Sequence, residues 1–282
     1  MISQLLGAMA RAATVFFIVA IPSTLIAGAS ENNAQAAILL AFAIAVVVGF
    51  EYGARYPAII GFRDAPPFNR LRAIAALATL FCLSMVAKAD FDTTFTWVLN
   101  ALGVLIGRAL DFPLSPVWVF FNTIPSDTPE IIVVQARIMA GLAIFIAFAT
   151  LCVFAILIRL HQWPNHGRAF NVWINLPTFD PTTGADVVKR LIHAARVNVI
   201  LGLVLLFLLP VGHTIVATHL GWAVFASLET MVWGIWVWMF LPLSFLMRGL
   251  AMARIADLIR ARRTRLAIQA HPATQSSVVQ PH

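Results

Sequence analysis

The chain of 282 residues is 61% hydrophobic and 11% charged, and its formal net charge is +7. A soluble domain carries about 25% charged residues, so this composition excludes an ordinary soluble globular protein. It predicts an all-α integral membrane protein, a bundle of about six transmembrane helices. Nucleic acid is not expected as a partner, because the positive charge follows the membrane topology inferred below.

Six apolar runs, taken in chain order, are predicted to cross the bilayer, which takes about 20 residues of helix. They cover 12–29, 36–56, 71–87, 131–160, 197–218 and 222–247. The first run resembles a signal peptide because Ala27-Gly28-Ala29 is an A-x-A-like site, but we expect a retained span. The fourth run is apolar on every side of its helix, which leaves no face for a soluble partner. Residues 1–251 are therefore expected to form one polytopic transmembrane domain.

The stretch 93–124 is predicted to form interfacial or re-entrant helices that lie against the bundle. Its two apolar pieces, Thr93 to Leu110 and Leu114 to Ile124, are marginal in length for a span. Trp97 and Trp118 are expected near the lipid headgroups. The alternative is a further span at Thr93 to Leu110. That span would place every later basic loop on the opposite side of the membrane.

Two basic amphipathic stretches are predicted beside the last two spans. The inner loop 161–196 ends in ADVVKRLIHAAR, which places Val187 and Leu191 opposite most of the basic residues. Residues 252–282 are expected to form a second basic amphipathic helix and a disordered tail. Its arginines are predicted to bind anionic lipids of the inner leaflet or another membrane-protein subunit. They are Arg254, Arg260, Arg262, Arg263 and Arg265.

The positions of the basic residues orient this layout. With the N-terminus inside and six spans, all but Lys88, Arg108 and Arg137 of the 19 lysines and arginines fall at the inner side. The positive-inside rule therefore predicts a multi-pass protein with both termini in the cytoplasm. Arginine outnumbers lysine 17 to 2, and alanine is abundant. This bias is common in GC-rich bacterial genomes and favours a bacterial inner membrane.

Three ionisable side chains inside the spans are candidates for a functional site, because each is costly there. Arg137, Glu229 and His213 are expected at similar outer-leaflet depth on three different helices. The economical arrangement is a buried Arg137–Glu229 ion pair with His213 nearby. Such a cluster would be either a structural clamp or a site for a proton or solute.

No cofactor and no metal site are predicted. A bis-histidine haem or chlorin site needs two imidazoles at one depth, and only His213 lies clearly within a span. A single ligand from His213 remains open, with a partner chain supplying the rest. Cys82 and Cys152 both fall inside apolar runs and are interpreted as small hydrophobic residues.

Catalytic motifs are absent from the sequence, which has no HExxH, GxSxG, Walker A, GxGxxG or CxxC pattern. We expect no enzyme. The aromatic residues Trp233, Trp236 and Trp238 are expected to pack against lipid or neighbouring helices. These features favour a non-catalytic accessory subunit or assembly factor of a larger membrane complex, for example an energy-transducing, respiratory or photosynthetic one. The alternative is a small-solute or ion transporter or channel that uses the Arg137, Glu229 and His213 site.

Overall fold

The computed structural model describes residues 2–26, 31–55, 58–88, 93–160, 186–220 and 227–276, together with residues 163, 164, 175, 176 and 179. Most of these residues are helical. The helices are α1 (Ile2–Leu25), α2 (Glu31–Gly53), α3 (Phe68–Ala87), α4 (Thr94–Ala109), α5 (Pro116–Phe121), α6 (Glu130–Leu160), α8 (Val187–Leu220) and α9 (Leu228–Ser276).

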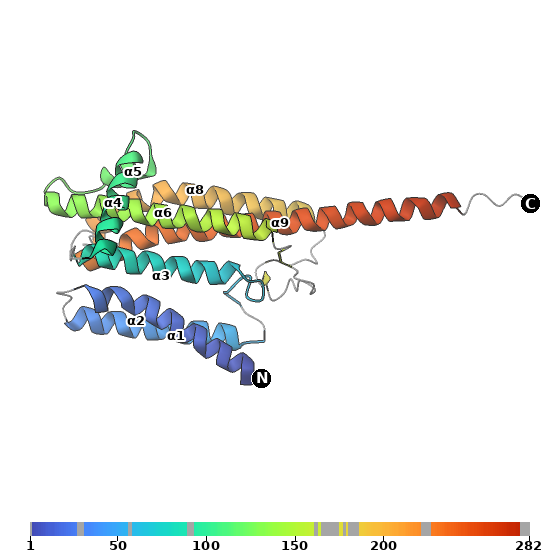
Figure 1. Ribbon diagram of the computed structural model, residues 1–282, viewed down its shortest axis with the longest axis horizontal. Coiled ribbons are helices and arrows are strands. Elements are labelled where there is room, and N and C mark those ends of the chain that lie inside the picture. The colour runs from blue at the N-terminus through green and yellow to red at the C-terminus, as the bar shows by residue number, and fades with distance from the viewer. Residues whose placement is uncertain are drawn as a thin grey trace, which may run out of the picture.

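Six of these helices, namely α1, α2, α3, α6, α8 and α9, are long and apolar enough to cross a membrane. The predicted set of six long apolar helices is thus confirmed for the part of the chain that the structure describes. Successive long helices run in opposite directions, so α1 begins and α9 ends at the same end of the bundle (Figure 1). We call this the basic end and the opposite one, where α4 and α5 lie, the α4 end.

The last two helices are longer than the predicted spans. The basic stretch before residue 197 is the first part of α8, which begins at Val187. The basic stretch after residue 247 is part of α9, which continues to Ser276 and thus into the stretch expected to be disordered. Residues 277–282 of that expected tail, and most of the loop 161–186, lie outside the described residues.

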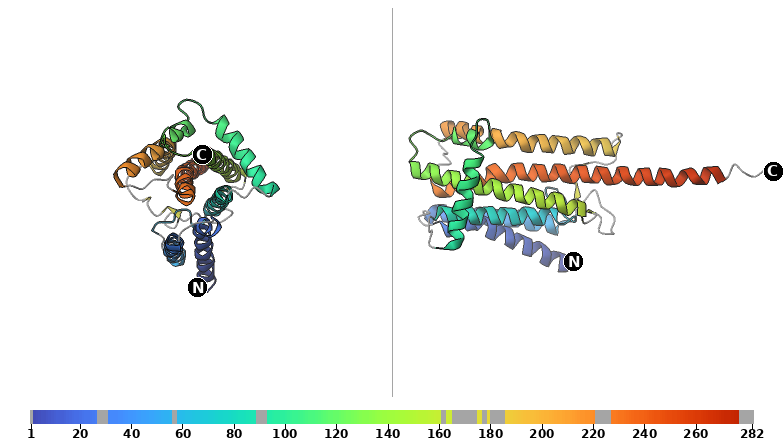
Figure 2. Two further views of the ribbon diagram at one scale, coloured as in Figure 1. Left: turned by 90° about the vertical axis from the view of Figure 1, so that its left-hand side faces the viewer. Right: turned by 45° about the horizontal axis from the view of Figure 1, so that its top comes forward.

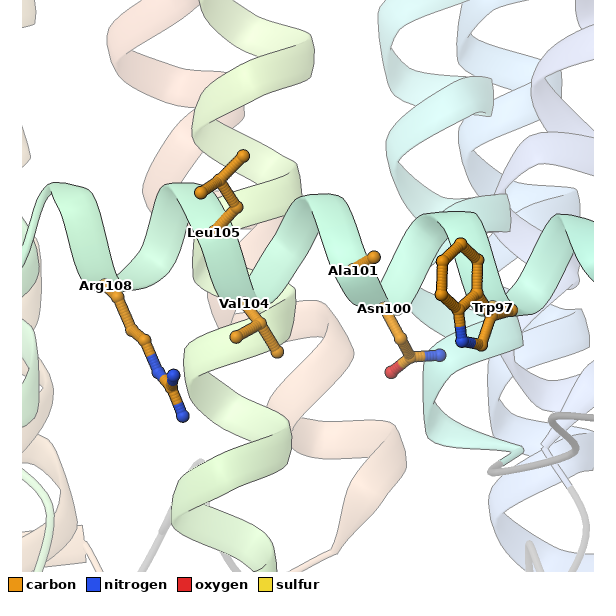
Figure 3. Close-up of a pocket in the computed structure, with 6 residues that line it drawn as sticks. All are labelled: Trp97, Asn100, Ala101, Val104, Leu105 and Arg108. Carbon is orange, nitrogen blue, oxygen red and sulfur yellow. The ribbon is translucent and has the colours of Figure 1, made fainter.

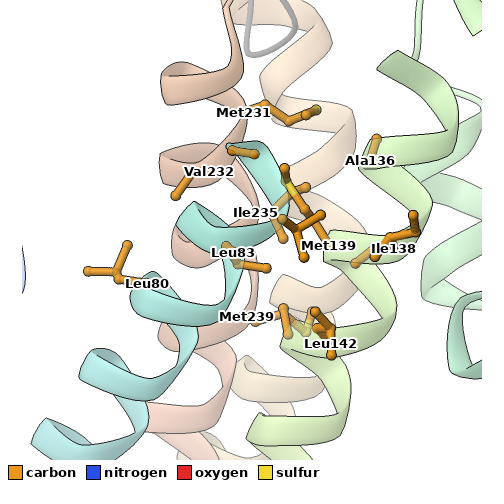
Figure 4. Close-up of a cluster of buried hydrophobic side chains, with 14 of the residues drawn as sticks. Leu80, Leu83, Ala136, Ile138, Met139, Leu142, Met231, Val232, Ile235 and Met239 are labelled. Carbon is orange, nitrogen blue, oxygen red and sulfur yellow. The ribbon is translucent and has the colours of Figure 1, made fainter. Parts of the chain in front are cut away.

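Three helices, α3, α6 and α9, enclose a hydrophobic core near the α4 end. Figure 4 shows Leu83 of α3, Met139 and Leu142 of α6 and Ile235 of α9 gathered between these helices. Each of the four is at most 1% exposed. Apolar side chains thus fill the space between the three helices.

A second hydrophobic core lies toward the basic end and is rich in aromatic rings. The rings of Phe68 in α3 and Phe154 in α6 meet edge to face, with centroids 5.6 Å apart. Trp163, which follows α6, is fully buried and lies 5.7 Å from the ring of Phe62. These rings join the segment that precedes α3 to the end of α6.

The hairpin of α1 and α2 lies at the side of this bundle (Figures 1 and 2). Small residues bring its two helices together: a Cβ on Gly49 would lie 3.4 Å from the Ala12 side chain, and Ala8 and Ala41 are buried. Beyond this mutual contact the hairpin packs mainly through α1 onto α3. Much of its apolar surface consequently faces away from the other helices.

The short helices α4 and α5 run across the long helices rather than alongside them (Figure 2). Both begin at a hydroxyl cap. The Thr93 hydroxyl accepts a hydrogen bond from the Thr96 backbone at 3.2 Å, and the Ser115 hydroxyl accepts one from Trp118 at 2.9 Å. With 16 residues, α4 is shorter than the helix that a bilayer core requires. The segment 93–110 therefore crosses the long helices and does not form a further span parallel to them.

Candidate functional site

An ion pair lies at the α4 end, where α4 crosses α6. Arg137 of α6 donates a hydrogen bond from its guanidinium to the carboxylate of Asp111, just after α4. The ring of Phe121 lies beside the same guanidinium, with its centroid 4.4 Å from the central carbon. The Arg137 side chain is 30% exposed and that of Asp111 is 21% exposed. The pair is therefore only partly enclosed.

Glycines allow α4 to approach α6 closely enough for this pair to form. A Cβ on Gly107 would lie 2.6 Å from the Arg137 carbonyl oxygen, and a Cβ on Gly141 would collide with the backbone of Gly103. Gly103 and Gly107 are four residues apart, which is the spacing of the G-x-x-x-G contact between helices. The crossing fixes the end of α4 beside α6 and thereby holds Asp111 next to Arg137.

The predicted ion pair between Arg137 and Glu229 is wrong, because the carboxylate on Arg137 is that of Asp111. Glu229 lies in the first turn of α9, which begins at Leu228 rather than at residue 222. There its carboxylate complements the partial positive charge of the helix N-terminus. His213 is partly buried in the last third of α8. Arg137 thus belongs to the α4–α6 crossing, and nothing in the described geometry gathers it with Glu229 and His213.

The three tryptophans of α9 contact other aromatic rings. Trp238 is buried, stacks on Phe120 of α5 at 4.6 Å and donates from its indole nitrogen to the Leu206 carbonyl oxygen at 2.8 Å. Trp233 and Trp236 meet edge to face at 5.5 Å, and Trp236 stacks on Phe240. Trp238 therefore links α9 to both α5 and α8.

The arginines of the C-terminal stretch lie in two settings. Arg254 is partly buried and donates to the Ile158 carbonyl oxygen at 3.2 Å, which ties α9 to the end of α6. Arg263 pairs with Asp186 at 2.8 Å. This hydrogen bond lowers the pKa of the Asp186 carboxyl. Arg260, Arg262 and Arg265 are exposed. The last part of α9 projects past the other helices (Figure 1).

The basic end carries a denser polar network, centred on the segment between α2 and α3. The carboxylate of Glu51 accepts hydrogen bonds from the backbone of Ala58, Ile59 and Ile60 at 2.9 to 3.3 Å. Arg63 donates to the carbonyl oxygen of Ala54 at 2.6 Å and to that of Glu51 at 3.2 Å. The chain reversal after α2 is thus held by charged side chains at both of its ends.

Asn175 connects this reversal to the loop that follows α6. Its backbone oxygen accepts from the Phe62 backbone at 2.7 Å, and its side-chain oxygen accepts from the Asp64 backbone at 3.0 Å. The indole of Trp163 donates to the Ala65 carbonyl oxygen at 3.2 Å. Phe62 has a φ of 54°, a left-handed conformation that is unfavourable for a bulky residue. The burial of its ring offsets that strain.

Beside this network, Arg72 of α3 reaches across to α9. Its Nε donates to the Ser244 hydroxyl at 3.3 Å, and its guanidinium lies 5.5 Å from the ring centroid of Phe68 and 5.6 Å from that of Phe240. The positively charged Arg248 of α9 also lies near it. An arginine in such surroundings can bind an anion.

Sequence reasoning missed most of this network. Trp163, Asn175 and Ser244 were not candidates, because their neighbours come from distant parts of the chain. One signal was present: the segment YPAIIGFRDAPPFNRLR (56–72) combines aromatic, proline and charged residues between two apolar runs. Such a mixture is typical of a loop with its own packed structure.

The outward face of α4 forms an open depression of about 370 Å³. Asn100, Val104 and Arg108 point to one side of the helix and Leu105 to the other, while the ring of Trp97 lies across the front of the helix (Figure 3). Trp97 and Leu105 are 65% and 66% exposed. This helix therefore presents an apolar side and a side with polar groups, as an interfacial helix does.

Within the described ranges, no three His, Cys, Asp or Glu side chains gather where they could hold a metal ion. The side chains of Arg137, Glu51, Arg63 and Asn175 bind other side chains or the backbone, an arrangement that positions helices. Comparisons of the chain with protein-family models, with curated proteins and with solved structures found no match.

Proposed function

We propose that this chain is a non-catalytic, multi-pass protein of the bacterial inner membrane that serves as an accessory subunit or assembly factor of a larger membrane complex. The observation that carries the proposal is the contrast between the packed trio of α3, α6 and α9 and the peripheral hairpin of α1 and α2. The trio forms a closed core, whereas the hairpin offers a wide apolar surface to something outside the chain.

The exposed surface of the hairpin has the character of a helix-binding face. Leu39, Phe42 and Phe50 of α2 are 69%, 61% and 75% exposed. A groove of about 970 Å³ runs between the two helices, and Phe16 and Phe17 of α1 contribute to its walls. In lipid, helices associate through close van der Waals packing, for which a groove beside small residues such as Gly49 is suited.

The charge distribution supports a cytoplasmic location of the basic end. Lysines and arginines gather where α1 begins and α9 ends, and the α4 end carries Lys88, Arg108 and Arg137. The positive-inside rule then places both termini in the cytoplasm. In this orientation α4 lies in the outer interface of the membrane.

Purification of the full chain from its native membrane in a mild detergent, followed by mass spectrometry, tests the proposal. We expect membrane-protein partners in stoichiometric amounts. The variants Phe42→Ala and Phe50→Ala are expected to lose them, while Ile200→Ala on α8, where the side chain is 59% exposed, retains them.

A chain that purifies alone would contradict this proposal. If the lone chain also supported solute-dependent flux in liposomes, the transporter alternative would replace it. Retention of the partners by both phenylalanine variants would show that the hairpin is not the contact surface.

A further inference from the structure

The side chain of Arg72 is surrounded by groups that orient it but do not neutralise it. A guanidinium has five N–H donors and stays protonated at any physiological pH. Arg72 uses one donor on the Ser244 hydroxyl and a second, at 3.5 Å, on the Asn69 side-chain oxygen. The other donors have no acceptor among the described residues. Phe68 and Phe240 flank the guanidinium, so its position is fixed by packing from α3 and α9.

The carboxylates of this region are engaged elsewhere. Glu51 accepts hydrogen bonds from the three backbone groups at 58–60. Asp64 lies 3.4 Å from Arg63 and is mostly exposed. Neither carboxylate forms an ion pair with Arg72 in the part of the chain that the structure describes. A partly buried cation without a counter-charge is costly, and arginine cannot relieve the cost by losing its proton.

The nearby side chains add further positive charge. Arg248 of α9 lies near enough to Arg72 for the two positive charges to act on each other. Together with the Ser244 hydroxyl, α3 and α9 thus direct two cationic groups and one hydroxyl to the place where they pack on each other at the basic end.

We propose that Arg72, together with Ser244, binds a phosphate group where α3 packs against α9 at the basic end. The planar fork of a guanidinium matches two phosphate oxygens, and hydroxyl groups can donate to the remaining ones. Arg72 lies about one turn from the start of α3, at the level where an apolar helix meets the lipid headgroups. The phosphate therefore belongs either to an anionic phospholipid or to a free phosphate compound.

The experiment measures thermal unfolding of the full-length chain by tryptophan fluorescence in two arms. In the first arm, nanodiscs of phosphatidylcholine receive increasing fractions of phosphatidylglycerol. In the second arm, inorganic phosphate replaces chloride in detergent at constant ionic strength. The test variant is Arg72→Gln. The matched control is Arg70→Gln, because Arg70 is exposed on the same helix and carries the same charge.

We expect the wild type and Arg70→Gln to gain thermal stability with the anion, and Arg72→Gln to lose about tenfold or more in apparent affinity. Stabilisation by phosphatidylglycerol alone identifies a lipid headgroup, whereas stabilisation by inorganic phosphate identifies a free compound. If Arg72→Gln does not fold, the variant Ser244→Ala keeps the arginine and is expected to weaken binding about fivefold through the lost hydrogen bond.

The proposal is overturned if neither anion stabilises the wild type. It is also overturned if Arg72→Gln, or Ser244→Ala when the first does not fold, responds to the anion as strongly as Arg70→Gln. The inorganic phosphate arm needs only the folded chain, so its result is independent of whether partner subunits exist.

Discussion

The two ends of the bundle are held by different kinds of contact. At the α4 end, helix backbones approach through glycines, and one ion pair, Arg137–Asp111, lies at the crossing. At the basic end, a loop is held by the hydrogen bonds of Glu51, Arg63 and Asn175 and by buried aromatic rings. An added carbon atom should therefore destabilise the α4 end, and the loss of a polar group should destabilise the basic end.

The largest effect is expected from Gly141→Ala, which tests the glycine crossing. The new Cβ would collide with the backbone of Gly103, which cannot rotate away as a side chain can. We expect a loss of about 1–3 kcal/mol in the free energy of unfolding, measured in detergent. Gly212→Ala is the control, because nothing lies within 4 Å of its Cβ position, and it should be neutral or slightly stabilising. Equal stability of the two variants would contradict the close approach of the α4 and α6 backbones.

The ion pair at the same crossing should contribute less. A double-mutant cycle of Arg137→Gln and Asp111→Asn is expected to give a coupling energy of about 1–2 kcal/mol, because both groups are only partly enclosed. The same cycle with Arg137→Gln and Glu229→Gln should give additive effects. A coupling energy that is larger for Glu229 than for Asp111 would show that Arg137 pairs with Glu229 and not with Asp111.

At the basic end, Glu51→Gln is expected to loosen the chain reversal after α2. It weakens three hydrogen bonds to an ionised acceptor that is partly solvated, so we expect a loss of about 1 kcal/mol. Hydrogen exchange of the Ala58, Ile59 and Ile60 amides should then accelerate roughly fivefold. The neighbouring variant Arg55→Gln should leave that exchange unchanged, and an equal acceleration in both variants would exclude a specific role of Glu51.

The smallest effect concerns the exposed pair of Asp186 and Arg263. The hydrogen bond from Arg263 lowers the pKa of Asp186, so the pair is fully formed above the ordinary carboxyl pKa of about 3.9 and is lost as pH falls through the lowered value. Spin labels on α8 and on the projecting part of α9 should report no change in distance between pH 8 and pH 5 and a broader distribution only below the ordinary carboxyl pKa of about 3.9. Asp186→Asn should show the broad distribution at every pH.

The six long helices could be predicted because the length and apolar composition of each run are enough to indicate a helix in apolar surroundings. The partner of Arg137 could not, because depth along a helix does not reveal which helices are neighbours. The spacing of Gly103 and Gly107 held that information, since it marks α4 as a helix that another backbone approaches closely. Glu51 lies near the end of the second apolar run, and no local pattern indicates that its carboxylate accepts from the backbone of the chain reversal.

The network at the basic end lies beyond any local pattern. Asp64 and Asn175 are 111 positions apart, and Arg72 and Ser244 are 172 positions apart. Such pairs are determined by the order in which the long helices pack. The local signals of capping, periodicity and charge were sufficient for the elements, but not for the contacts between them.

The continuity of α9 has a mechanical consequence. Its 49 residues form one helix, about 70 Å long at 1.5 Å per residue, without a loop between the packed part and the projecting part. Met231 and Ile235 are buried in the core, whereas residues 260–269 near the other end of the same helix are exposed. A tilt of the packed part of α9 therefore also displaces its projecting end, so the position of that end follows the packing of the core.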